Sequence, residues 1–166
     1  MVPNPDGSED IITFGSGAHV PNAMVFDKNG NLYVSDSFQG AIFRILKLDL
    51  TKPALSAGAV SIFAESINGA DGIAFDRRSR LWVAANQADE VVGLNAKGKV
   101  VAKLGDFQGI RNDGSPRGLL FPASLVILDD EMFVTNLALP LNGTTGDEPE
   151  EDVTRYRVSR MKIPHH

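Results

Sequence analysis

A unit of two hydrophobic segments joined by a polar turn recurs three times in this sequence. The copies cover residues 20–36, 68–84 and 121–136, and the second segment of each carries an aromatic residue at the same place. These aromatic residues, about 50 positions apart, are Tyr33, Trp82 and Phe133,. Because repeats of about 40–50 residues with several short strands are typical of β-propellers, the sequence predicts an all-β propeller.

Hydrophobic segments around each unit predict the strands of one blade. The expected strands of the first blade are 23–27, 31–36, 41–46 and 59–64, and those of the second are 72–76, 80–85, 90–95 and 99–104,. In the third blade they are 124–128, 131–136 and 153–163. We therefore expect one half-propeller domain over residues 1–166, with about three four-stranded blades at 11–64, 71–104 and 122–163.

The two ends of this arrangement are complementary. Phe14, in the apolar segment 11–14, precedes Asn22 by as many residues as Phe63 precedes Asp71, so this segment has the phase of an outer strand. The third blade lacks such a strand. Because propellers close with about four to eight blades, three blades leave edges and faces uncovered. We expect either a homodimer that completes a six-bladed propeller or a fragment of a longer chain.

Composition excludes several classes of function. The net charge of −5 argues against a nucleic-acid surface, and the absence of cysteine excludes thiol catalysis and disulfides,. No apolar run approaches the roughly 20 residues that span a bilayer, so we expect no membrane partner. Residues 1–7 have neither a basic segment nor an apolar core, which predicts no signal peptide there, and localisation stays open,. The acidic stretch 142–152 is expected to be a flexible loop,.

Polar residues stand in phase immediately before the innermost strands. In a propeller these strands begin near the central axis, so Asn22, Asp71 and Ala123 are expected at the mouth of the channel,. Asn22 and Asp71 offer oxygen ligands suited to a hard divalent cation, whereas Ala123 offers none. Side chains that cap turns are the other interpretation of the same two residues.

Three motifs resemble the SMP-30/gluconolactonase/LRE-like family. Pro21-Asn22-Ala23 resembles the family's Pro-Asn-Gly motif, and residues 70–84, from Ala70-Asp71-Gly72 to Leu-Trp-Val-Ala, are similar to its Pro-Asp-Gly signature. Residues 119–136 resemble the segment that follows. The similarity extends over about 11–163, which corresponds to the C-terminal half of a six-bladed propeller.

The resemblance implies a cation site and an activity. Family members hold one divalent cation with a Glu, two Asn and an Asp, and Asn22 and Asp71 match the second Asn and the Asp. We expect one divalent cation, Ca²⁺ before Mg²⁺, Mn²⁺ or Zn²⁺, with Asp71 also acting as general base on a small-molecule substrate. The Glu and the first Asn have no counterpart here, and Ala23 and Ala70 replace a Gly and a Pro of the motifs.

Two functions follow as hypotheses. The first is a metal-dependent hydrolase that opens a lactone or similar cyclic ester. The second is a non-catalytic, NHL-like propeller module that binds a ligand or a protein, which the position of Ala123 favours. Other residues carry less weight. Asp36, Asn86, Gln87 and Asn136 end strands, where polar side chains usually satisfy backbone groups but can also lie beside the channel. Arg111 and Arg117, in the long connection 105–121 that is expected to be a loop or lid, are candidates to meet an anionic substrate, with solvent exposure as the other interpretation. His19 is expected in a turn, with the channel mouth as the other interpretation. No serine stands in a Gly-x-Ser-x-Gly setting,.

Overall fold

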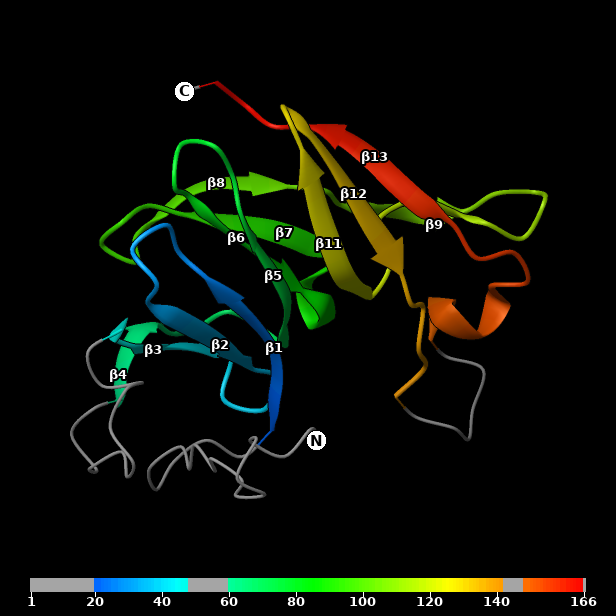
Figure 1. Ribbon diagram of the computed structural model, residues 1–166. Helices are drawn as coiled ribbons and strands as arrows, with labels where there is room; N and C mark the ends of the chain where they lie inside the picture. Colours follow the sequence, from blue (N-terminus) through cyan, green and yellow to red (C-terminus); the bar gives the residue numbers. More distant parts are fainter. Residues whose placement is uncertain (1–19, 48–59, 142–147, 166) are drawn as a thin grey trace, which may run out of the picture.

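Three meandering antiparallel sheets, formed by successive stretches of the chain, make up most of the fold (Figure 1). The computed structural model describes residues 20–47, 60–141 and 148–165. The first sheet contains β1 (Pro21–Phe26), β2 (Leu32–Asp36), β3 (Ala41–Ile45) and β4 (Val60–Ala64), in that spatial order. The second contains β5 (Ala70–Phe75), β6 (Leu81–Ala85), β7 (Glu90–Leu94) and β8 (Val100–Leu104). The third contains β11 (Pro122–Leu128), β12 (Glu131–Asn136) and β13 (Val158–Lys162).

Each sheet is one blade, and the first strand of each blade lies innermost. Strand β5 contacts both β1 and β11, so the three inner strands lie side by side (Figure 1). A separate hairpin of β9 (Phe107–Ile110) and β10 (Pro116–Gly118) connects the second blade to the third. Two short 3₁₀ turns, η1 (Asn86–Ala88) and η2 (Pro149–Asp152), follow β6 and precede β13.

Three hairpin turns, β1–β2, β5–β6 and β7–β8, share one arrangement of residues. Asp27, Asp76 and Asn95 each accept, through Oδ1, the backbone N–H groups of the residues two and four positions later. The residue three positions later has a positive φ, where glycine costs least. These residues are Gly30, Ser79 and Gly98, with φ of 82°, 60° and 73°. The spacing of an Asx residue and a small residue therefore positions both strands of each hairpin.

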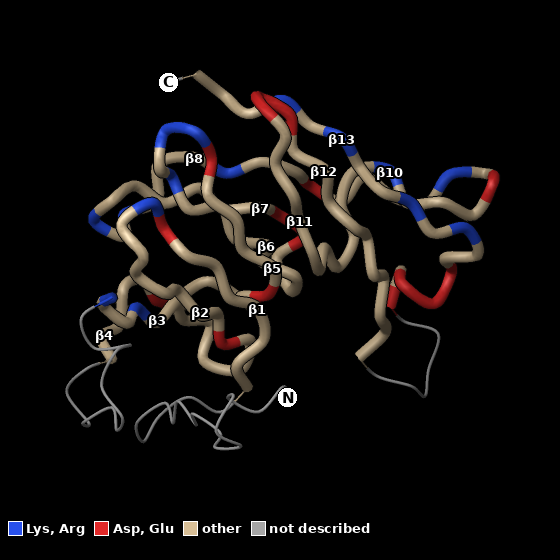
Figure 2. The backbone as a smooth tube through the Cα atoms, viewed as in Figure 1, with Lys and Arg blue, Asp and Glu red and all other residues tan. Residues whose placement is uncertain are grey.

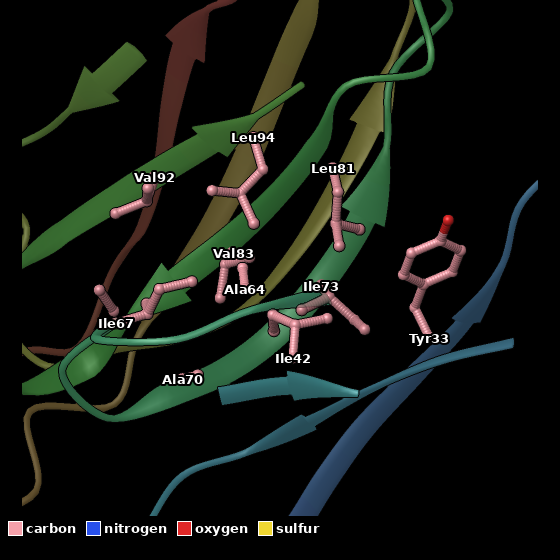
Figure 3. Close-up of a cluster of buried hydrophobic side chains, with 11 residues drawn as sticks. Tyr33, Ile42, Ala64, Ile67, Ala70, Ile73, Leu81, Val83, Val92 and Leu94 are labelled. Atoms are coloured by element: carbon pink, nitrogen blue, oxygen red, sulfur yellow. The ribbon is translucent and has the colours of Figure 1, made fainter. Parts of the chain in front are cut away.

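Hydrophobic side chains hold neighbouring blades together. The cluster between the first and second blades is shown in Figure 3, where Tyr33 and Ile42 of the first blade face Leu81 and Val83 of the second. Between the second and third blades, the fully buried Trp82 packs with Leu125, Met132 and Val134. Because apolar residues alternate along the inner strands, each blade buries both faces only when it has a neighbour on both sides.

A buried ion pair lies at the turn that follows β5. Asp76 accepts hydrogen bonds from Arg80 Nε at 2.7 Å and from Trp82 Nε1 at 3.0 Å, and the Arg80 guanidinium lies over the Trp82 ring. Burial by itself raises the pKa of Asp76, but these hydrogen bonds outweigh it and hold the pKa below its usual value,.

Charged residues of both signs are mixed over the described chain, and many lie in turns (Figure 2).

The structure confirms the propeller blades and corrects several boundaries. The inner strands begin at Pro21, Ala70 and Pro122, so the candidate site residues lie inside strands and not in the loops before them. The connection 105–121 contains the β9–β10 hairpin and is not a plain loop. In the described chain, the third sheet has three strands, as expected. The segment 11–14 and residues 142–147 lie outside the described residues.

The predicted strand 153–163 was wrong in extent, because only 158–162 pair with β12. The backbone N–H groups of Thr154 and Arg155 both bond to Gly114 O in the turn of the β9–β10 hairpin. Ion pairs from Arg155 and Arg157 to Asp113 hold the same segment. The chain is therefore bound to the hairpin until Arg157 and joins β12 afterwards.

Gly72 is required for the contact between β5 and β11. A Cβ at this position would lie 2.5 Å from Ala123 O and 2.7 Å from Ser124 Cα, both backbone atoms that cannot turn away. We expect Gly72→Ala to lower the free energy of unfolding by about 1–3 kcal/mol in urea denaturation, as overpacking does. Gly72 is not in the left-handed region, so the whole loss reports crowding against β11. A Gly72→Ala variant as stable as wild type would contradict this account.

Candidate functional site

The inner strand of every blade contains the same β-bulge near its start. The pairing shifts between Pro21↔Asp36 and Met24↔Val34 in the first blade. Equivalent shifts occur in the second blade, between Ala70↔Ala85 and Ile73↔Val83, and in the third, between Pro122↔Asn136 and Leu125↔Val134. Two inner residues therefore oppose one residue of the next strand, which re-aims the side chain of the first. The first residue of each bulge is Asn22, Asp71 or Ala123.

Hydroxyl groups satisfy the bulges of the two end blades. Ser35 Oγ accepts from Ala23 N at 2.9 Å and donates to Ala23 O, and Thr135 Oγ1 does the same for Ser124. In the middle blade the opposing residue is Ala84, and the second bulge residue is Gly72, which lies against β11. The middle bulge is thus held by close strand packing and not by a hydroxyl.

Ser37 links Asn22 to the strand that carries Asp71. Asn22 Nδ2 donates to Ser37 Oγ at 3.0 Å, and Ser37 Oγ donates to Ala70 O at 2.9 Å, one residue before Asp71. Because the amide nitrogen of Asn22 is hydrogen-bonded to Ser37, the amide oxygen of this exposed side chain is left to act as a ligand atom,. The structure therefore places the two predicted residues at equivalent positions of neighbouring inner strands, linked through Ser37.

Asp71 is half-buried and is held by a second amide. Asn86 Nδ2, in η1, donates to Asp71 Oδ2 at 3.3 Å, and Asn86 Oδ1 is buried without a hydrogen-bond partner. Burial raises the pKa of the Asp71 carboxyl, and the hydrogen bond from Asn86 offsets this only in part. A carboxyl with a raised pKa beside an open face is suited to exchange protons.

The third position of the repeat carries no functional side chain. Ala123 is the counterpart of Asn22 and Asp71, and its carbonyl lies against Gly72. The described part of the chain therefore offers two side-chain oxygen ligands from its three bulges. Within the same residues, no group of three or more His, Asp or Glu side chains is arranged to hold a metal ion.

Strand-end polar residues mostly form hydrogen bonds with the backbone. Asp36 accepts from the N–H groups of Val20, Phe38 and Gln39. Asn136 accepts from Leu120 N and donates to Ser159 Oγ. Asn86 is the exception, because it contacts Asp71. Its link to Asp71 and the role of Ser37 were missed from the sequence, since neither follows from spacing within the repeat.

The arginines of the connection 105–121 differ from each other. Arg111 Nη1 donates to Pro116 O across its own hairpin at 2.7 Å, which is a structural role. Arg117 is exposed on β10. The interpretation of either as a substrate-binding residue stays a prediction, and His19 lies outside the described residues.

A cavity of about 420 Å³ borders this face between the first and second blades. Ser37, Phe38 and Gln39 line it on one side, and Asn68, Gly69 and Gln87 line it on the other. Gly69 has a φ of 65°, and a Cβ there would meet Asn86 Oδ1 at 1.8 Å. Glycine at this position therefore allows Asn86 to reach Asp71 beside the cavity.

Solved β-propellers share this fold. A luciferin-regenerating enzyme matches with a TM-score of 0.63 at 16% identity, over 85% of this chain and 44% of that one. The calcium-binding protein regucalcin from Agrobacterium tumefaciens matches with a TM-score of 0.61 at 18% identity, over 87% of this chain and 46% of that one. A gluconolactonase from Xanthomonas campestris matches with a TM-score of 0.63 at 18% identity, over 92% and 46%.

The family follows from the sequence match. The model of the SMP-30/Gluconolactonase/LRE-like region matches residues 2–105, and the chain belongs to this family. The chain spans a little under half the length of the solved structures named above. No curated protein sequence matches it. Among the described residues, no helix is both long and apolar enough to cross a membrane.

The raised pKa of Asp71 predicts a pH-dependent cost in stability. The folded state binds the Asp71 proton more tightly than the unfolded chain does, so stability falls as pH rises from about 3.8 through the folded pKa,. Asp71→Asn keeps the acceptor for Asn86 and cannot ionise. With chelator present, we expect urea denaturation to show this variant slightly more stable than wild type at about pH 7, and the difference to vanish near pH 3.

Asp113 supplies the control of opposite sign. Its hydrogen bond from Ser115, with the charges of Arg157 and Arg155, lowers the pKa of Asp113 to about 2. Asp113→Asn should therefore be less stable than wild type at about pH 7, with the difference lost as pH falls toward 2. An Asp71→Asn variant that behaves like Asp113→Asn would contradict the assigned environment of Asp71.

Proposed function

We propose that this chain contributes half of a divalent-cation-dependent hydrolase site that opens a lactone or similar cyclic ester. The observation that carries the proposal is the pair of equivalent bulges that present Asn22 and Asp71 on adjacent inner strands, joined through Ser37. Membership of the SMP-30/Gluconolactonase/LRE-like family supports it. The structural neighbours include a protein named as calcium-binding and another named as a gluconolactonase.

The chemistry of the two residues fits a hard cation. Amide and carboxylate oxygens are the ligands that Ca²⁺ and Mg²⁺ take in proteins, with Ca²⁺ the more tolerant of irregular geometry. When bound, such an ion supplies polarisation of the substrate carbonyl and a lower pKa for water. Asn22 and Asp71 would hold it, and Ser37 and Asn86 would keep both side chains oriented, as outer hydrogen-bond partners of ligands do,.

Asp71 has the environment of a general base. It is half-buried and oriented by Asn86, and its deprotonated form would accept the proton of the attacking water,. The neighbouring cavity of about 420 Å³ has room for the ring of a small cyclic ester,. Asn68 and Gln87 line it and offer hydrogen bonds to substrate hydroxyl groups,.

A non-catalytic binding module is the second candidate, and Ala123 favours it. The third bulge offers no ligand, and the bulges of the described residues supply two ligand side chains, too few for the six to eight oxygen ligands that Ca²⁺ takes,. In that case the cavity beside Ser37 would bind a small molecule without turnover. Hydrolysis that depends on both Asp71 and a cation separates the two candidates.

The hydrolase is tested with glucono-δ-lactone, followed by proton release above the uncatalysed rate, in Ca²⁺ and in chelator. We expect chelator to remove activity and Asp71→Asn to lower kcat/KM by at least about 100-fold. Ser37→Ala should raise the Ca²⁺ concentration for half-maximal rate about tenfold, with less effect on kcat, because Ser37 orients a ligand. Asn29→Ala, exposed in the turn at the other end of β1, is the control. Full activity in Asp71→Asn would refute the assignment.

The end blades expose apolar side chains at positions that are covered in the other blades. On the side of the preceding blade, Met24 is 67% exposed, whereas its counterparts Ile73 and Leu125 are 7% and 5% exposed. On the side of the following blade, Val126 is 62% exposed, while its counterpart Val25 packs against the cluster shared with the second blade. Each end face therefore has the apolar character of a contact between blades.

We propose that a second copy of the chain covers both faces. The third blade of one copy would pack on the first blade of the other, twice, which repeats the contact between successive blades and closes a ring. Because one chain covers 44–46% of the solved propellers, two copies have about the number of blades of one relative. Asn22 and Asp71 of both copies would then face one axis and supply four side-chain oxygen ligands.

Light scattering after size-exclusion chromatography tests the ring. We expect a species of twice the chain mass, and Met24→Glu should shift it toward the monomer because a carboxylate would be buried at the contact. Val101→Glu is the matched control, since Val101 is 50% exposed on the outer strand of the middle blade. A stable folded monomer of the wild-type chain would contradict the proposal and would leave further blades of a longer polypeptide as the covering partner.

A further inference from the structure

A second cavity, of about 520 Å³, lies at the opposite end of the inner strands from the bulges. Within the described chain, it lies between the first two blades and is bordered by the turns that follow β1 and β5. Residues that give it chemical character are Lys28, Tyr33, Arg44, Phe63, Phe75 and Arg77. None of these residues takes part in the candidate hydrolase site.

Three aromatic rings line one side of this cavity. Tyr33 meets Phe63 at a centroid distance of 4.9 Å and Phe75 at 5.1 Å, both in edge-to-face geometry. Tyr33 lies at the edge of the hydrophobic cluster between the blades, as Figure 3 shows. Phe63 and Phe75 are partly exposed, so their rings offer an apolar surface that another ring can extend,.

Arg44 carries one N–H donor, at Nε, that the described residues do not satisfy. It pairs with Tyr33 across β2 and β3, and its guanidinium carbon lies 5.7 Å from the centre of the Phe63 ring. Its Nε is buried without a hydrogen-bond partner. Burial raises the pKa of the Tyr33 hydroxyl, and a hydrogen bond with the Arg44 guanidinium lowers it, so the rest of the guanidinium has a partner in Tyr33. A buried donor without a partner costs free energy, which an acceptor in the cavity would recover.

Among the other charged residues of the cavity, Asp76 and Arg77 have partners of opposite charge. Asp76 is bound by Arg80, and Arg77 donates to Asp130 at 2.7 Å. Asp27 accepts hydrogen bonds from the backbone and side chain of its own turn. Lys28 is exposed at the rim and has no ion pair among the described residues. Asp27 keeps its negative charge near Tyr33, and Arg44 and Lys28 together exceed it by one positive charge beside the aromatic rings.

We propose that this cavity binds a small aromatic carboxylate. The carboxylate would accept hydrogen bonds from Arg44, with Lys28 adding attraction at the rim, and the ring of the ligand would pack against Phe63 and Phe75,. A cavity of this volume lies within the range of small-molecule sites and accepts a ligand of one or two rings,. The site is independent of the hydrolase proposal, because its residues are at the other end of the inner strands.

The test is a calorimetric titration with three related probes. 2-Naphthoate has both the ring and the charge, 2-naphthalenemethanol has the ring alone, and decahydro-2-naphthoate has the charge alone. We expect 2-naphthoate to bind about tenfold more tightly than either of the others, because a charge-assisted hydrogen bond and an aromatic contact each contribute. Equal binding of acid and alcohol would overturn the proposal, as would no binding of 2-naphthoate at millimolar concentration.

Variants assign the binding to this cavity. Arg44→Gln should weaken 2-naphthoate about tenfold and leave 2-naphthalenemethanol unchanged. Arg160→Gln is the control, since Arg160 is an exposed arginine on β13 of the third blade. Should Arg44→Gln unfold, Lys28→Gln, on the exposed turn, keeps the test, with an expected loss of about two- to threefold that depends on salt. If Arg44→Gln folds and binds 2-naphthoate as tightly as wild type does, the proposal is overturned. If Arg44→Gln does not fold, unchanged affinity of Lys28→Gln for 2-naphthoate overturns it.

Discussion

The close approach of β5 to β11 positions the bulge that carries Asp71. A side chain at Gly72 would meet the backbone of Ala123 and Ser124, so glycine permits the two inner strands to lie side by side. The bulge at the same place re-aims Asp71, and the matching bulge in β1 re-aims Asn22. Ser37 then joins the two strands by hydrogen bonds to Asn22 and to Ala70 O. One backbone irregularity, repeated in each blade, thus aligns the polar side chains.

Much of the fold was predictable because its signals are local and repeat. The Asx residues 27, 76 and 95, each followed three positions later by a small residue with positive φ, fix the hairpin turns, and the alternating apolar residues fix which faces are buried. The bulges were not predictable. A bulge places two residues of one strand opposite a single residue of its partner, so it is defined by the pairing of two strands and not by the sequence of either one. The early end of β13 depends on Gly114, far away in sequence, and the contacts of Ser37 and Asn86 likewise cross between elements.

The candidate site and the stability of the fold make opposing demands. Burial raises the pKa of Asp71, so the ionised carboxylate that chemistry requires is a cost to the folded chain. Asp76 shows the structural alternative at the other end of the same strand, where Arg80 and Trp82 satisfy a buried carboxylate and lower its pKa. The end blades carry a similar cost, because Met24 and Val126 are exposed apolar side chains. A partner that covers these faces would remove that cost.

A calorimetric titration of the wild-type chain with Ca²⁺ tests the central claim most directly, because it measures both the site and its sharing between two copies. The account predicts saturable binding with about one ion for every two chains, lost in Asp71→Asn and weakened in Ser37→Ala. Binding that persists in Asp71→Asn, or the absence of any binding at millimolar Ca²⁺, would contradict it.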